Sequence, residues 1–240
     1  MEERAATTRK TGAGKPAAID YSSGKLPKPL LRWKDATALR ARRKMFEQFQ
    51  RVIPTDRSSR VLDVGVTPEQ AITSNNFFED LYPWKDRITA TSIEDASFLE
   101  AEYPGLRFVQ TDGVSLPFND GEFDAVFSSA VVEHVGSREQ QQQFARELLR
   151  VGKRFFVTTP NRWFPVDLHT GLPLIHWMPR SIHQGVLRRI GMDFWASTDN
   201  LNLLDGDSFL GLFSPAASVE LIKFRTAGMT SNLIVHGSPA

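Results

Sequence analysis

The sequence predicts a doubly wound α/β fold, with a mainly parallel sheet and an antiparallel hairpin at its C-terminal end. Through residue 159, short apolar segments typical of buried strands alternate with amphipathic segments typical of helices. The chain has 240 residues, of which 41% are hydrophobic and 24% are charged. This is the length and composition of one globular domain with an extension. We expect a flexible basic arm over residues 1–30 and a single domain over residues 31–240.

The domain is predicted to begin with a helix followed by a buried strand. Residues 36–53 carry apolar side chains every three or four positions, and Pro54 ends this helix. The run Arg60–Gly65 has the sequence RVLDVG, which is typical of a parallel strand buried on both faces. Its final glycine suits a tight turn at the carboxyl end of the strand.

Strands and helices continue to alternate through the middle of the chain. The predicted strands cover residues 87–93, 106–110, 123–128 and 154–159. A short helix over residues 95–103 is ended by Pro104 and Gly105. A longer helix over residues 137–151 begins with Ser137 and Gln140, which form the pattern of a capping box.

The C-terminal part of the chain has two different patterns. Residues 160–200, the lid segment, are rich in Pro, Trp and His and have no clean periodicity. They follow a strand directly, so we expect them to cover the substrate side of a binding site. Residues 218–225 and 231–236 predict two strands joined by Ala227 and Gly228, which is typical of a hairpin.

The composition excludes several classes of function. The chain has 0 cysteines, which excludes disulfides, thiolate nucleophiles, zinc ribbons and iron–sulfur clusters. It contains no run of about 18 apolar residues, so no segment is predicted to span a membrane. The first residues are polar and charged, without the apolar segment of a secretory signal. We therefore expect a cytoplasmic protein.

Charge is distributed unevenly along the chain. Residues 1–60 hold 15 Lys and Arg against 6 Asp and Glu, a net charge of +9, and the rest holds 14 against 22, a net charge of −8. The basic arm either folds back on the acidic body or binds an anionic partner such as RNA. No nucleic-acid motif accompanies the charge, so a nucleic acid is not the expected partner.

Small and polar residues follow the predicted strands, at the edge where doubly wound sheets bind ligands. The positions are Asp63, Gly65, Thr67, Ser92, Glu94, Asp112, Gly113, Ser129, His134, Asn161 and Arg162. The first strand lacks the G-x-G-x-x-G sequence of dinucleotide sites, and no P-loop is present, which argues against nicotinamide cofactors and ATP. Residues 67–70, Thr-Pro-Glu-Gln, predict instead a helix start with Thr67 as its N-cap.

Six segments, taken in order, resemble a known family. They are Val61–Gly65, Asp112–Gly113, Leu116–Phe118, Phe123–Phe127, Glu133–Val135 and Thr158–Asn161. This ordered set resembles the class I S-adenosylmethionine-dependent methyltransferases, and looks closest to the small-molecule branch called type 11. The resemblance covers about residues 55–162. It implies a Rossmann-like methyltransferase fold with seven strands and S-adenosylmethionine as the cofactor.

The resemblance also implies roles at the cofactor site. Asp63 and Gly65 match the first motif, whose loop, including Thr67, wraps the methionine end of the cofactor. Asp112 matches the acidic residue that accepts a hydrogen bond from the adenine amino group, and Gly113 lets the backbone approach the ring. A carboxylate suits this task because it accepts N–H donors and would repel a phosphate.

Further positions are implied on the sulfonium side and at the ribose. Ser129 and Ala130 follow the fourth strand below the sulfonium, and Glu133 with His134 lines the same pocket.

Two departures from the family pattern concern the same cofactor. Val66, Thr67 and Pro68 stand where the family has further glycines. Ser92 stands where the family has the acidic residue for the ribose, with Ile93 next and Glu94 as a possible substitute.

Methyl transfer needs a base only where the acceptor carries a proton at neutral pH. His169 and His134 are the candidate bases, and Asp167 lies close enough in sequence to His169 to orient its ring.

The expected substrate-binding residues are Asn161, Arg162, Trp163, His169, His176 and Trp177. Arg162 could hold an anionic group, and the tryptophans could stack on a ring or a cation. We expect no metal, because the evenly spaced His169, His176 and His183 would not converge on one ion.

These observations predict an S-adenosylmethionine-dependent methyltransferase that acts on an O or N atom of a small-molecule acceptor. Two alternatives stay open. One is a methyltransferase-like binding or regulatory protein without transfer activity, suggested by the glycine-poor first loop. The other is an RNA methyltransferase whose basic arm contacts phosphates. The sequence leaves the acceptor, the oligomeric state and the pathway open.

Overall fold

The computed structural model describes residues 28–69 and 75–240, with side chains from residue 38 onward. Its sheet has seven strands in the order β3-β2-β1-β4-β5-β7-β6. The strands are β1 (Val61–Val64), β2 (Ile88–Ser92), β3 (Arg107–Gln110), β4 (Ala125–Ser129), β5 (Phe155–Pro160), β6 (Ala216–Thr226) and β7 (Met229–Pro239). Strands β1 to β5 are parallel, and β7 pairs antiparallel with both β5 and β6. The predicted doubly wound, mainly parallel sheet with a C-terminal hairpin is confirmed.

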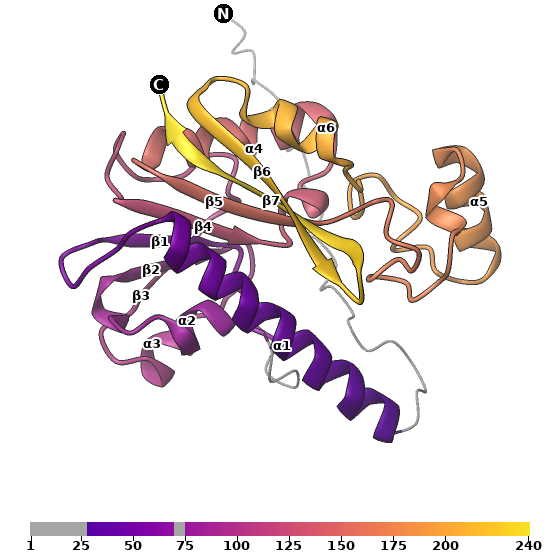
Figure 1. Cartoon of the computed structure of the whole chain (residues 1–240), viewed down its shortest axis with the longest axis horizontal. Coiled ribbons are helices and arrows are strands. Elements are labelled where there is room, and N and C mark those ends of the chain that lie inside the picture. Colours follow the sequence, from indigo (N-terminus) through magenta and orange to yellow (C-terminus); the bar gives the residue numbers. More distant parts are fainter. Residues whose placement is uncertain (1–27, 70–74) are drawn as a thin grey trace, which may run out of the picture.

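Helices cover both faces of this sheet (Figure 1). They are α1 (Lys28–Val52), α2 (Phe77–Leu81), α3 (Leu99–Glu102), α4 (Arg138–Val151), α5 (Arg180–Arg189) and α6 (Gly206–Leu210). Four short 3-10 helices join them: η1 (Lys85–Arg87), η2 (Val132–His134), η3 (Ile175–Trp177) and η4 (Gly211–Phe213). Helices α1 to α3 lie on one face, and α4 and α6 lie on the other. No helix in the described residues is long and apolar enough to cross a bilayer.

Each face of the sheet has its own apolar core. On the α1 side, Phe49 of α1 packs edge-on against Phe127 of β4 and Phe156 of β5, with ring centroids 5.6 Å apart in both pairs. On the other side, Phe144 and Leu148 of α4 belong to a second buried cluster. The strands between them are buried on both faces, as their continuous apolar runs predict.

Several local predictions hold in detail. Helix α4 begins with the capping box, in which the Ser137 hydroxyl accepts from the Gln140 N–H and the Gln140 side chain accepts from the Ser137 N–H. The β6–β7 hairpin turns at Ala227 and Gly228, with φ of 51° and 80°. Two positive φ values are typical of the tight turn that matches strand twist.

Two predicted boundaries are wrong. Helix α1 begins at Lys28, inside the predicted arm, whose remaining residues lie outside the described part. Residues 95–103 form a helix only at α3, because the Asp95 carboxylate accepts from the Ser97 N–H and holds a turn there. The predicted helix start at Thr67 continues into residues 70–74, which lie outside the described part. The Thr67 hydroxyl accepts from the Glu69 N–H at 3.2 Å, as an N-cap does, and the Asn76 side chain forms two hydrogen bonds with the Thr67 backbone.

The lid segment has a small core of its own. Leu187 of α5 packs with Trp195, Ala196 and Leu201, all buried. At its start, the Asn161 side chain donates to the Thr230 carbonyl oxygen of the β6–β7 hairpin, 2.9 Å away. The lid is therefore an ordered insertion attached to the end of the sheet.

Candidate active site

The loop after β1 is held tightly against the loop after β4. The N–H groups of Gly65 and Val66 both donate to the Thr91 carbonyl oxygen at the end of β2, at 2.8 and 3.0 Å. Gly65 has a φ of +104°, and a β-carbon there would collide with the side chain of Val131. Only glycine tolerates this conformation at so close a contact.

Asp63 does not face the edge of the sheet directly. Its side chain is buried beside that of Glu79 on α2, which is also fully buried. Burial and the neighbouring Glu79 charge raise the pKa of Asp63, and burial raises the pKa of Glu79 to about 7. Lys85 donates to the Glu79 backbone oxygen instead of its carboxylate. The two carboxyl groups therefore share an interior site beneath the first loop, and sequence reasoning missed Glu79.

The end of β2 carries the next three predicted residues. The Ser92 side chain is buried, and its hydroxyl accepts from the Glu94 N–H at 3.3 Å. Ile93 is exposed, and its carbonyl oxygen accepts from the Gln110 side chain at 2.9 Å. Glu94 is half-buried at this edge. Its carboxylate stands two residues beyond the position where the family carries an acid.

The loop after β3 is a turn built on Asp112. Its Oδ1 atom accepts from the Val114 and Ser115 N–H groups, both at 3.1 Å, and the exposed carboxylate keeps its other oxygen without a partner among the described residues. Gly113 follows with a φ of +74°, and a β-carbon there would lie 3.0 Å from the Phe144 ring. The turn thus presents one carboxylate oxygen outward from a conformation that requires glycine.

The loop after β4 contains a strained residue. Ala130 has a φ of 57°, the left-handed region that alanine rarely adopts. Its N–H donates to the Thr158 carbonyl oxygen at 3.0 Å, and the Ser129 hydroxyl lies 3.0 Å from the Thr158 hydroxyl. Such strain concentrates at functional sites, where surrounding contacts hold it in place.

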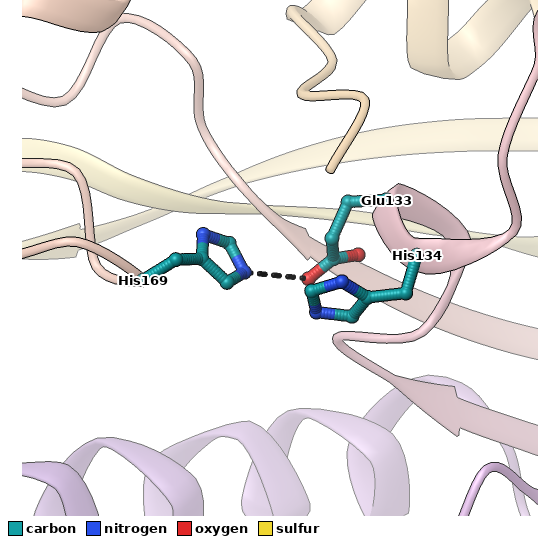
Figure 2. Close-up of side chains that lie close together, drawn as sticks. All are labelled: Glu133, His134 and His169. Carbon is teal, nitrogen blue, oxygen red and sulfur yellow. Dashed lines mark ion pairs between the residues drawn. The ribbon is translucent and has the colours of Figure 1, made fainter. Parts of the chain in front are cut away.

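Glu133 of η2 lies at the centre of a buried charged cluster (Figure 2). Its Oε2 atom accepts from the Thr159 hydroxyl at 2.9 Å, and its Oε1 atom lies 3.8 Å from Nε2 of His169 in the lid. On the other side of the ring, His169 Nδ1 lies 3.1 Å from Oδ1 of Asp167. His169 therefore bridges two buried carboxylates that come from different parts of the chain.

These contacts fix the charge of the cluster. Burial alone would lower the pKa of His169, but the contacts with Asp167 and Glu133 outweigh it and raise the pKa to about 9. The same contacts with His169, opposing burial, lower the pKa of Asp167 to about 2. His169 is consequently an imidazolium at neutral pH.

His134 lies against this cluster from the other side. Its ring centroid is 4.9 Å from that of His169, and its Nδ1 atom lies 2.7 Å from the Asn200 carbonyl oxygen. Burial lowers the pKa of His134, so this ring is neutral at neutral pH. A carbonyl can only accept, so Nδ1 carries the hydrogen and Nε2 carries the lone pair.

One ligand atom from each of Glu133, His134 and His169 lies within 4.8 Å of the others, a spacing that could hold a metal ion. His169 supplies one positive charge between the two carboxylates of Glu133 and Asp167, and His134 is neutral, so the cluster as a whole keeps a net negative charge.

The lid also encloses a small cavity of about 20 Å³. Its lining residues come from the lid and the segment that follows it: Arg162, His176, Arg180, His183, Gln184, Trp195, Leu201, Asn202 and Leu203. Arg162 Nε, His176 Nδ1 and His183 Nε2 are buried without hydrogen-bond partners. No carboxylate lines the cavity. It is thus a cationic hollow with unused polar atoms.

Trp195 joins this cavity to the charged cluster. Its ring lies 5.4 Å from that of His169 and 6.1 Å from that of His134. Asn202, on another wall, accepts from Arg180 at 2.6 Å and donates its backbone N–H to the Glu133 carbonyl oxygen at 2.7 Å. Cavity and cluster are therefore neighbouring parts of one site.

The structure separates the predicted substrate residues into two groups. Arg162 and His176 line the cavity, and His169 lies in the cluster. Trp163 and Trp177 face outward instead, with their rings 6.2 Å apart. Asn161 ties the lid to the hairpin.

The central part of this chain matches a known protein family. A family model described as a methyltransferase domain matches residues 62–155. This part of the chain is a methyltransferase domain. The matched span begins in β1 and ends in β5, so it contains the carboxyl edges of β1 to β4 and the Glu133–His134 pair. The lid and the hairpin lie beyond it.

Individual methyltransferases are similar over different lengths. Chloroplastic tocopherol O-methyltransferase of Arabidopsis thaliana is 30% identical over 105 residues, 42% of this chain and 28% of that relative's length. A Thermotoga maritima methyltransferase, described as a possible histamine N-methyltransferase, superposes with a TM-score of 0.55 at 13% identity, covering 88% of this chain and 95% of that one. The N-terminal domain of EvdMO1, with S-adenosylhomocysteine bound, superposes with a TM-score of 0.51 at 16% identity, covering 85% and 81%. These structural matches establish the fold.

Several residues of the site could not be predicted from the sequence. Arg180, Trp195 and Asn202 fall in a region with no periodicity, and only the folded lid brings them beside Glu133. The abundance of Trp, His and Arg in the lid was the one available signal.

Proposed function

We propose that this chain transfers a methyl group from S-adenosylmethionine to an O or N atom of a small acceptor. One observation carries the proposal: three residues with positive φ lie around the carboxyl end of β1. Gly65 contacts Val131, the neighbour of Ala130, and Gly113 lies close to the Val64 side chain. Constrained backbone concentrates at functional sites, and ligands of doubly wound sheets bind at this edge. Three constrained loops here therefore support a binding site.

The residues at this edge fit the cofactor in chemical type. Asp112 offers a carboxylate oxygen to the adenine amino group, and Gly113 keeps the adjoining backbone free of a side chain. Ser92 and Glu94 offer oxygens to the ribose hydroxyls. The loop from Gly65 to Thr67 would hold the methionine end, and Ser129 and Ala130 would lie beneath the sulfonium. When bound, the cofactor supplies a methyl group already activated on sulfur, so the protein has mainly to position the acceptor and exclude water.

His134 is the residue we assign to take the acceptor's proton. With S-adenosylmethionine bound, the cofactor would supply the methyl group to the acceptor's O or N atom and leave as S-adenosylhomocysteine, and His134 Nε2 would receive the proton that the acceptor gives up. The lowered pKa of His134 supports this role because the ring is unprotonated at neutral pH. His169 holds its own proton there and serves to orient Glu133, and it would act as a base only near its pKa of about 9.

The cavity beside this cluster suggests how the acceptor is held. Arg162 and Arg180 both line it and bring two guanidinium groups to it. Neither arginine forms an ion pair with a carboxylate in the described residues. Guanidinium groups bind carboxylate and phosphate oxygens well. We propose that an anionic end group of the acceptor binds these guanidinium groups at the cavity while its reactive atom reaches toward His134.

Calorimetry tests the cofactor step, and product analysis tests the transfer. We expect the protein to bind S-adenosylmethionine and S-adenosylhomocysteine, and to add one CH2 by mass to a member of an anionic metabolite library. Arg162→Gln should weaken turnover of that acceptor without changing cofactor affinity. If neither S-adenosylmethionine nor S-adenosylhomocysteine binds, the enzymatic proposal fails.

A second candidate is a methyltransferase-like protein that binds a ligand without transfer. Two observations favour it: Val66, Thr67 and Pro68 stand where the family has further glycines, and Ser92 replaces an acid at the ribose. S-adenosylhomocysteine binding without methylated product across the library would select this candidate. The proposed RNA methyltransferase depends on residues 1–27, which lie outside the described part.

A further inference from the structure

Exposed apolar side chains are concentrated on one part of this protein. Of the ten large apolar side chains that are exposed in the described residues, eight lie between residues 163 and 190. They include Trp163, Leu168, Leu174, Trp177, Met178 and Ile182. The other two, Ile93 and Met229, lie apart in other elements. Single exposed apolar residues are ordinary, but a concentration of this kind marks an interaction surface.

These side chains are neighbours in space as well as in sequence. The rings of Trp163 and Trp177 are in contact, and Val166 pairs with Pro173 in a short antiparallel bridge. Leu174 donates its N–H to the Pro165 carbonyl oxygen. We call the exposed side chains of residues 163–190 the lid surface.

Positive charge predominates on the lid surface. Residues 160–200 contain four arginines, Arg162, Arg180, Arg188 and Arg189, and three acidic residues, Asp167, Asp193 and Asp199. Asp167 is buried and paired with His169, and the exposed Asp193 and Asp199 follow the lid surface in the chain. The last turn of α5 carries Arg188 and Arg189, and both are exposed. Tryptophan, isoleucine and arginine on one surface are the residues that interfacial helices present to lipid.

The lid surface is also placed where a flat partner can reach it. Leu187 anchors α5 into the small lid core, while Ile182 of the same helix and Ile190, which follows the helix, are exposed. Figure 1 shows α5 standing out from the sheet at one end of the long axis of the molecule. A protruding, ordered, basic and apolar surface can enter the headgroup region of a bilayer without unfolding.

We propose that the lid surface docks this protein on anionic lipid bilayers, with its apolar side chains in the interface and its arginines on lipid phosphates. A bilayer is favoured over a protein because the apolar residues are spread over a protruding segment whose exposed charges between residues 163 and 190 are those of Arg180, Arg188 and Arg189. This docking is independent of methyl transfer. It would also place the cationic cavity, which shares Arg162 and Arg180 with this segment, beside molecules held in the membrane.

Vesicle co-sedimentation of the full chain tests the docking. We expect binding to vesicles of phosphatidylcholine mixed with phosphatidylglycerol, and much weaker binding to vesicles of phosphatidylcholine alone, since each arginine near an anionic surface contributes roughly a five-fold gain in partition. The Leu168→Ser/Ile182→Ser double variant should lower the partition about ten-fold, because two partly exposed side chains no longer enter the interface.

The chain offers a matched control for the apolar change. Ile93 and Met229 are 52% and 46% exposed, against 45% and 50% for Leu168 and Ile182, and they lie outside the lid. The Ile93→Ser/Met229→Ser double variant should bind vesicles as the wild type does. Equal losses in the two double variants would overturn the proposal, because general hydrophobicity would then explain the binding.

A charge reversal provides an independent comparison. Arg189→Glu should reduce binding to the anionic vesicles by about five-fold or more, whereas Arg107→Glu, on the exposed edge strand β3, should not. If the wild-type protein does not bind to the anionic vesicles, the proposed docking is wrong. A dimer of the wild type that becomes a monomer in the Leu168→Ser/Ile182→Ser variant would also overturn it. Sedimentation would then show that the lid surface binds a second copy of this chain.

Discussion

Oδ1 of Asp167 lies 3.1 Å from Nδ1 of His169, and this buried contact favours the protonated, positively charged form of His169 within the lid. The Thr170 hydroxyl donates to the other Asp167 oxygen at 2.7 Å, so the carboxylate is fully engaged. Nε2 of the same ring faces Glu133, which belongs to the sheet domain. Because the imidazolium is the cation between two carboxylates, its proton contributes to the attachment of the lid.

We therefore expect the free energy of unfolding to depend on the protonation of His169. Its folded pKa of about 9 lies above the ordinary value of 6.5, so its contribution is fully present below pH 6.5 and is lost as the pH rises through about 9. A shift of this size corresponds to on the order of 3 kcal/mol. Urea unfolding across that range measures it. His169→Gln should lack the decline, and a wild-type profile identical to that of the variant would contradict the assignment.

Glu79 produces a pH dependence in a different window. Burial raises its pKa from 4.5 to about 7, so the native state holds a proton that the unfolded chain has already released. Its contribution is present below pH 4.5 and is lost as the pH rises through about 7. We expect Glu79→Gln to be more stable than the wild type above neutral pH by roughly 1–3 kcal/mol, and no more stable in acid.

Thermal and urea unfolding of Glu79→Gln at the two ends of this window make the comparison. Glu102→Gln, on the exposed surface of α3, is the matched control and should change stability little at any pH. Equal stability of Glu79→Gln and the wild type above neutral pH would show that Glu79 is ionised in the native state.

Asp112 permits a substitution that separates binding from folding. Its Oδ1 atom holds the turn after β3, and asparagine can accept the same two N–H donors. Asp112→Asn should therefore fold normally, yet bind S-adenosylhomocysteine about ten-fold more weakly, because the charged acceptor for the adenine amino group is lost. Asp56→Asn is the control, since Asp56 holds a similar exposed turn elsewhere. Unchanged calorimetric affinity in Asp112→Asn would remove this residue from the proposed cofactor site.

The sequence predicted what depends on local pattern. Buried strands, the α4 capping box and the Ala227–Gly228 turn are set by residues close together in the chain. The proximity of Asp167 and His169 in sequence suggested that one could orient the other, and the structure brings them into contact. The partners of Asp63 and of His169, namely Glu79 and Glu133, could not be predicted, because no periodicity fixes how α2 or the lid packs on the sheet. Trp163 and Trp177, which were expected to bind substrate, are exposed on the lid.

Gly65 combines a conformational requirement with a steric one, and the two can be measured separately. Gly121 also has a positive φ, +61°, but a β-carbon there meets nothing within 4 Å, so Gly121→Ala reports backbone strain alone, about 1–2 kcal/mol. Gly65→Ala adds a collision with Val131 and should destabilise by distinctly more. The Gly65→Ala/Val131→Ala double variant should recover part of the difference, because the shorter side chain leaves room for the new methyl group. Urea unfolding of the three variants makes the test. Equal losses at Gly65 and Gly121 would mean that the loops after β1 and β4 are not in close contact, and the proposed binding edge would lose its main structural support.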